Sequence, residues 1–149
     1  MLSTLSAPPQ QRPPLSVLRR VGTWTVHDPE DLVSLRQSVV TAVLSWRDAH
    51  HRSHPARQDH LTLIATELAT NALKYGAPPV ITSLYRQHDG WLIDVEDGHA
   101  DTAPLPYPPE PGRPGRNGIL IVSKLSRRWG WYAHHADTAR KHVWAWLRD

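Results

Sequence analysis

The sequence predicts an α/β two-layer sandwich, in which one mixed, mostly antiparallel sheet carries helices on one face. Apolar residues recur at helical spacing in two long segments, 28–50 and 55–75. Two short strands flank a tight Asp89-Gly90 turn, and two further strands close the chain after a short apolar helix. A chain of 149 residues can bury one core, so we expect a single domain.

Composition and charge exclude several classes of protein. The absence of cysteine excludes a disulfide framework and any cysteine-based zinc site, and it fits a reducing compartment. A net charge of +3 is too small to indicate nucleic-acid binding by itself. The residues after Met1 lack a signal-peptide pattern, and no apolar run approaches about 18 residues. We therefore expect a soluble, cytoplasmic protein without direct contacts to nucleic acid or membrane.

The first third of the chain predicts a tail, a strand and a helix in that order. Residues 1–16 are rich in proline and polar residues, which predicts a disordered tail, and residues 17–149 form the domain. A first strand is expected within 17–26. Asp28 as N-cap and Pro29 at the first helical position then predict the first of the two helices.

The second helix is expected from Pro55 to Tyr75, and Gly76 ends it. Two polar residues on it, Glu67 and Asn71, are four positions apart and therefore project about 40° apart on the helix surface. Both lie at the edge of the apolar stripe, between core and solvent. An acid and an amide in this arrangement can share one divalent metal ion and the phosphates that it carries. The alternative is that both are ordinary polar residues beside the core.

A carboxylate ends the second strand of the expected hairpin, which consists of 80–87 and 91–97. Asp97 has the same parity as the apolar residues of its strand, so we expect it on the core face. A buried carboxylate needs hydrogen-bond donors, and the exocyclic amine of adenine is one group that provides them. Alternatively, Asp97-Gly98 is simply a turn.

A long proline-rich stretch, 99–117, leads into an apolar helix at 119–125. Residues 112–118, with the sequence GRPGRNG, combine glycines and arginines directly before that helix. Backbone amides at such glycines, the helix N-terminus and an arginine fork can bind phosphate oxygens. The alternative is a flexible loop with an ordinary N-terminal glycine, and the ending of a Walker A loop is missing.

Two strands, 128–134 and 141–147, are expected to complete the sheet, and the second one alternates apolar residues. Part of the histidine content forms two clusters, which are His50, His51 and His54, and His134 and His135. Neither cluster is paired with cysteine or placed on a helix at metal-ligand spacing. We therefore interpret these histidines as solvated surface residues.

The three polar motifs follow one another in an order that resembles the GHKL (Bergerat-fold) ATPases. Within that superfamily the chain is similar to the small anti-sigma-factor type of histidine-kinase-like ATP-binding protein. The similarity covers residues 17–148, and Glu67–Gly76 is its most specific part. Residues 128–130 (RWG) and 143–145 (VWA) also resemble this group. The resemblance implies a Bergerat fold with ATP and Mg²⁺ as cofactors.

The resemblance also implies a role for each matching residue. Asn71 would coordinate Mg²⁺, and Glu67 would be the general base for a serine hydroxyl or a water molecule. Asp97 would bind the adenine amine, with Gly98 allowing close approach of the base. The phosphates would be covered by a lid that includes the residues Gly115, Arg116 and Gly118.

The implied activity is ATP-dependent phosphorylation of a serine or threonine on a partner, typically an anti-anti-sigma protein, coupled to sequestering a sigma factor. Homodimers are usual in the group. Two departures concern turnover: Arg116 and Asn117 occupy the middle of the lid, where glycines are common, and His142 stands where a late threonine often touches the nucleotide. The alternative function is a non-catalytic module that binds a sigma factor or another regulator, with ATP structural or absent.

Overall fold

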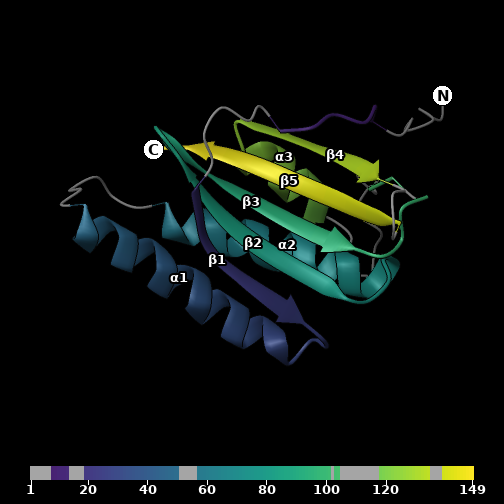
Figure 1. The fold of residues 1–149 in the computed structure, drawn as a ribbon, viewed down its shortest axis with the longest axis horizontal. Helices are drawn as coiled ribbons and strands as arrows, with labels where there is room; N and C mark the ends of the chain where they lie inside the picture. Colours follow the sequence, from purple (N-terminus) through teal and green to yellow (C-terminus); the bar gives the residue numbers. More distant parts are fainter. Residues whose placement is uncertain (1–7, 14–18, 51–56, 102, 105–117, 135–138) are drawn as a thin grey trace.

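The computed structural model describes residues 8–13, 19–50, 57–101, 103–104, 118–134 and 139–149. In this part of the chain, five strands form one antiparallel sheet, which three helices accompany in an α/β fold (Figure 1). The strands are β1 (Arg19–Val26), β2 (Val80–Gln87), β3 (Gly90–Asp97), β4 (Arg128–His134) and β5 (Arg140–Arg148). The helices are α1 (Asp31–Ala49), α2 (Gln58–Tyr75) and α3 (Gly118–Leu125). None of these helices is long and apolar enough to cross a membrane.

The strands lie in the order β1-β2-β3-β5-β4, and every neighbouring pair is antiparallel. The predicted antiparallel character is therefore confirmed, whereas the parallel pairing of a mixed sheet does not occur among the described strands. The β2–β3 hairpin is also confirmed, but its turn lies one residue earlier than predicted. Gln87 pairs with Gly90, which leaves His88 and Asp89 as the turn residues.

Both long helices are present, with small differences at their starts. α1 begins at Asp31 because the predicted N-cap, Asp28, forms a turn ahead of the helix: its side chain accepts a hydrogen bond from Glu30 N at 2.9 Å. α2 begins at Gln58 with Arg57 as its N-cap, which is later than the predicted start at residue 55; residues 55 and 56 lie outside the described residues. α2 ends at Tyr75 as predicted.

Side chains of β3 alternate between two faces of the sheet. Trp91, Ile93 and Val95 are at most 2% exposed and join the main apolar cluster, so we call their side the core face. α2 packs across β2, β3 and β5 and contributes the fully buried Leu61 and Ile64. α1 packs against α2 and β1, and α3 packs against α2 and β4. α2 is therefore the element that connects the parts of the core.

A buried arginine ties α1 to the sheet. The guanidinium of Arg86, on β2, lies 4.3 Å from the ring centre of Trp46 and 4.9 Å from that of Trp91. Both of its terminal nitrogens donate hydrogen bonds to Asp149, at 2.7 and 2.6 Å. A planar cation packed against two aromatic rings, with a forked carboxylate partner, is a way to keep a charge inside the core.

Residues 8–13 lie within the segment predicted to be disordered, yet they contact β4 and β5. Gln11 N donates a hydrogen bond to Trp131 O at 2.7 Å, and the Trp131 indole donates to Pro8 O at 2.8 Å. The indole of Trp144 donates to Gln11 O, also at 2.8 Å. Two buried indole groups thus obtain their hydrogen-bond acceptors from this segment.

Leucine-to-alanine substitutions on α2 provide a test of the core. Leu61 is fully buried, whereas Leu63 is 40% exposed on the same helix. We expect Leu61→Ala to lower the free energy of unfolding by about 2–5 kcal/mol, because it removes buried methyl groups and leaves a cavity. Leu63→Ala, the matched control, should lower it by less than about 1 kcal/mol. Urea unfolding followed by circular dichroism measures both, and equal losses would contradict the described packing.

Candidate functional site

The acid and the amide of α2 meet the first residue of α3. The two helices pack against each other, and a methyl group on Gly118 would lie 2.9 Å from Glu67 Oε2 and 3.3 Å from Asn71 Oδ1. Glycine keeps this space open between the helices. The N-terminal end of α3, with its positive partial charge, is thus beside a carboxylate and an amide oxygen. Such a combination can bind phosphate oxygens together with a divalent metal ion.

Burial changes the acid–base properties of Glu67. Burial raises the pKa of Glu67 above its ordinary value, and the nearby Lys74 opposes this rise without cancelling it. The physical cause is that a partly desolvated carboxylate is less stable in its charged form. A carboxylate with a raised pKa is a stronger base, which suits a group that takes a proton from a hydroxyl.

Asp97 lies on the core face, as its parity predicts, and is 1% exposed. Its Oδ1 accepts hydrogen bonds from His99 N at 2.7 Å and from Ala77 N at 3.4 Å. Its Oδ2 lies 3.5 Å from Lys141 Nζ. Asp97 is therefore a buried carboxylate that is stabilised by backbone donors on one oxygen and by a cation on the other.

Two glycines let the end of α2 approach the end of β3 closely. A methyl group on Gly76 would lie 2.6 Å from Asp97 Cγ, so the contact requires glycine. Gly98 N donates a hydrogen bond to Ala77 O at 2.7 Å, which fastens the residue after β3 to the residues after α2. The position of Asp97 relative to α2, and thus to Asn71, is fixed by these contacts.

A mostly apolar pocket lies between α2, β3 and α3. Asn71, Asp97 and Lys141 contribute the polar part of its lining, and Ala103 and Pro104 belong to its wall. The cavity measures about 40 Å³, which is room for a few water molecules. The predicted metal ligand and the predicted base-binding carboxylate therefore line one pocket.

Lys141 is a site residue that the sequence interpretation missed. In the pairing of β3 with β5, Asp97 is opposite Lys141 and Glu96 is opposite His142. Lys141 therefore reaches the pocket, whereas His142, which was compared with the late threonine of the resembling family, points to the other face. Strand parity predicts this position, because Lys141 alternates in step with the apolar residues of the last strand and therefore lies on the core face.

Of the predicted lid residues, Gly118 is described, while Gly115 and Arg116 lie outside the described part of the chain. No protein-family model matches this chain, and no curated protein matches its sequence. The assignment of the site therefore depends on the geometry of the described residues.

Replacement of Glu67 by glutamine should change how stability depends on pH. Because the folded-state pKa of Glu67 is raised from 4.5, the folded protein binds this proton more tightly than the unfolded chain does. The contribution of Glu67 to the free energy of unfolding is therefore fully present below the ordinary glutamate pKa and is lost as pH rises above it. Glu67→Gln lacks this titration, so it should gain stability relative to wild type between about pH 4 and 7. Urea unfolding of both proteins across that range measures the difference, and a constant difference would contradict the expectation.

Proposed function

We propose that this protein is an ATP-binding regulatory protein of the GHKL class, of the anti-sigma-factor serine/threonine kinase type. The observation that carries the proposal is the convergence of Glu67 and Asn71 on Gly118 at the start of α3. A base, a metal ligand and a phosphate-binding helix end are then in one place, which phosphoryl transfer requires. The resemblance of residues 67–76 to the family motif supports the same assignment.

The layout of the elements supports a Bergerat fold. In Figure 1, α2 and α3 pass behind the strands of the sheet, and α1 packs against α2 and β1. A layer of helices packed on one face of the sheet would give a two-layer sandwich, with the sheet as the second layer. The chain order α2, β2, β3, Asp97 and α3 is also the order in which the resembling family carries its acid–amide helix, its aspartate and its lid helix.

The described residues fit Mg²⁺-ATP by their chemistry. Bound Mg²⁺-ATP would supply the phosphoryl group and the cation that neutralises its charge. Asn71 would offer its amide oxygen to the metal ion, and Asp97 would accept a hydrogen bond from the adenine amine, with Gly98 beside it. Glu67 would accept the proton of the attacking serine or threonine hydroxyl, for which its raised pKa is suited. The predicted lid would add Gly115 and Arg116.

Ala103 and Pro104 would form part of the wall around the bound base. They line the same pocket as Asn71 and Asp97, so they would contact a base that enters it. They directly precede the long proline-rich stretch in which the predicted lid lies.

A second candidate function, a non-catalytic module that binds a sigma factor or another regulator, is favoured by one contact. Lys141 Nζ lies 3.5 Å from Asp97 Oδ2, the carboxylate that would bind adenine. An adenine amine would have to share this carboxylate with a buried ammonium group, which weakens base recognition. If nucleotide binding has been lost in this way, the protein would act through its binding surface alone.

The partners belong to the same proposal. A kinase of this type would phosphorylate an anti-anti-sigma protein and would hold a sigma factor, in the cytoplasm and without touching nucleic acid or membrane itself. A homodimer would be the expected assembly, as in the resembling group. A net charge of +3 fits protein partners better than DNA.

Binding of Mg²⁺-ATP separates the two functions. We expect the wild-type protein to bind Mg²⁺-ATP in isothermal titration calorimetry, and Asn71→Ala to weaken that binding about tenfold or more because it removes a metal ligand. Thr70→Ala, the neighbouring substitution on α2, should leave the affinity unchanged. No binding heat and no thermal shift with the wild-type protein would remove the kinase and favour the binding module.

Phosphoryl transfer tests the role of Glu67. With labelled ATP and the products of neighbouring genes, the wild-type protein should label one partner on serine or threonine. Glu67→Gln should bind Mg²⁺-ATP like the wild type but transfer phosphate about 100-fold more slowly or worse, because it cannot accept the proton. Equal transfer rates for the wild type and Glu67→Gln would show that Glu67 is not the base.

A further inference from the structure

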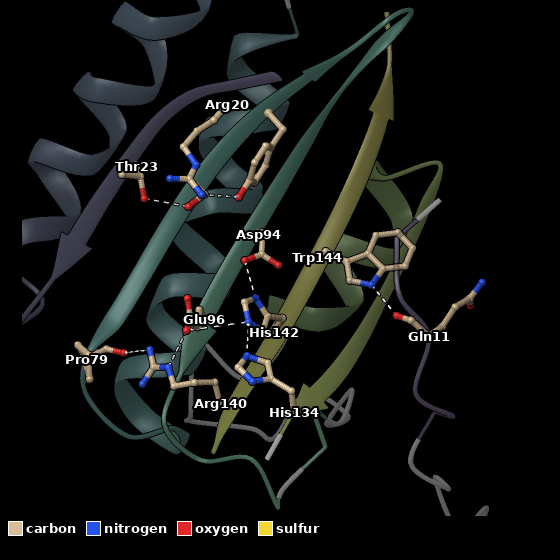
Figure 2. Close-up of polar contacts among 12 residues, drawn as sticks. Gln11, Arg20, Thr23, Pro79, Asp94, Glu96, His134, Arg140, His142 and Trp144 are labelled. Atoms are coloured by element: carbon tan, nitrogen blue, oxygen red, sulfur yellow. Dashed lines mark hydrogen bonds and ion pairs between the residues drawn. The ribbon is translucent and has the colours of Figure 1, made fainter. Parts of the chain in front are cut away.

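Two histidines and a glutamate gather on the face of the sheet opposite the core face. Glu96 comes from β3, His134 from β4 and His142 from β5, and Figure 2 shows their side chains turned toward one another. The Nε2 atoms of the two histidines are 3.2 Å apart, and His142 Nε2 is 4.0 Å from Glu96 Oε1. One ligating atom from each residue lies within 4.8 Å of the others. All three side chains are partly buried, so the interpretation of His134 as a solvated surface residue is wrong.

The distances fit a single metal ion among these three residues. Zinc binds histidine nitrogen at about 2.0–2.1 Å, so two nitrogens on one tetrahedral zinc are about 3.3 Å apart. The observed separation of 3.2 Å between the histidine nitrogens is close to this value. Two imidazoles and one carboxylate form a donor set that suits zinc and leaves a fourth position for water or a substrate. Magnesium and calcium prefer oxygen ligands and fit this set poorly.

Asp94 orients one of the two rings. Its Oδ2 lies 2.9 Å from His142 Nδ1, on the side of the ring away from His134 (Figure 2). When Nδ1 donates its proton to the carboxylate, Nε2 carries a lone pair that points into the cluster. Carboxylate partners of this kind fix the tautomer and the orientation of metal-binding histidines. Asp94 is one of the buried polar residues of the protein, so this orientation is protected from solvent.

Neighbouring side chains also contact His142 and Glu96. The Tyr132 ring stacks parallel on His142 with 4.6 Å between ring centres, and the Arg12 guanidinium lies 4.5 Å from the Tyr132 ring centre on β4. Arg140 Nε donates a hydrogen bond to Glu96 Oε1 at 2.7 Å. This oxygen is also the one nearest His142, but each carboxylate oxygen has two lone pairs, so Glu96 can bind Arg140 and a metal ion together. With Asp94 and Glu96 as anions, the cluster can accept a dication despite the arginines.

We propose that Glu96, His134 and His142 bind one divalent transition-metal ion of the zinc type, with Asp94 positioning His142. This site is separate from the proposed nucleotide site, because Glu96 and Asp97 are consecutive residues that reach opposite faces of β3. The metal would join β3, β4 and β5 across the sheet. Its fourth ligand would come from water or from a small ligand with an oxygen or nitrogen donor.

Metal binding is measured with the full chain carrying no affinity tag, because a polyhistidine tag itself binds zinc. Calorimetric titration with Zn²⁺ should give one site per chain, and Co²⁺ should give the visible absorption of a tetrahedral site. We expect His142→Ala and His134→Gln each to weaken Zn²⁺ binding by more than about 100-fold. Asp94→Asn should weaken it by about 10–100-fold, because the ring loses its orienting partner.

Two variants serve as matched controls for histidine content. His88→Gln replaces an exposed histidine at the β2–β3 turn, and a double variant, His51→Gln with His54→Gln, removes part of the other histidine cluster. Both controls should keep the wild-type affinity for Zn²⁺ and the Co²⁺ spectrum. Zn²⁺ should also raise the melting temperature of the wild type and of both controls, but not that of His142→Ala.

The proposal is overturned if the wild type shows no stoichiometric Zn²⁺ binding and no tetrahedral Co²⁺ spectrum. It is also overturned if a folded His134→Gln, which lies on the outer strand, binds Zn²⁺ as the wild type does, or if the double control variant loses binding. Absence of Zn²⁺ binding by the wild type would show that His134 and His142 only share a hydrogen bond. None of these readouts involves ATP, so failure of the nucleotide proposal leaves this test intact.

Discussion

The alternation of side chains along β3 is the constraint on which both candidate sites depend. β3 is paired on one side with β2 and on the other with β5, so its register is fixed along its whole length. Asp97 therefore reaches the core face, while its neighbour Glu96 reaches the opposite face. A slip of one residue would exchange these two carboxylates and turn Trp91 out of the core. The same burial that stabilises the sheet thus assigns one acid to each site.

α2 positions the polar side chains of the pocket relative to this sheet. Its apolar stripe packs on three strands, and its rim carries Glu67 and Asn71 toward Gly118 at the start of α3. The close contact of Gly76 with Asp97 joins the helix end to the strand end. Groups that need exact placement are therefore on a helix and a strand. Ala103 and Pro104, which line the same pocket, are instead loop residues.

Helical period and strand parity correctly predicted on which side of their element several site residues lie. The helical period placed Glu67 and Asn71 at the rim of the core, and strand parity placed Asp97 on the core face, as the structure describes them. Strand parity also places Lys141 on the core face, whereas the resemblance compares its neighbour His142 with the late threonine. The histidine pair on the opposite face and the docking of residues 8–13 depend on pairings between distant segments. Neither hydrophobic period nor composition specifies the register of β4 against β5, so these contacts could not be predicted from the sequence.

Residues 8–13 also affect how copies of this chain can meet. β4 is an outermost strand, and a bare edge of this kind recruits strands from other molecules. Two backbone groups of β4 are already occupied, because Trp131 O accepts from Gln11 N and Ala133 N donates to the Gln10 side chain. The prolines of the segment lack the amide hydrogens that a further strand would need. A segment with the composition of a linker thus protects this border of the sheet against edge-to-edge aggregation.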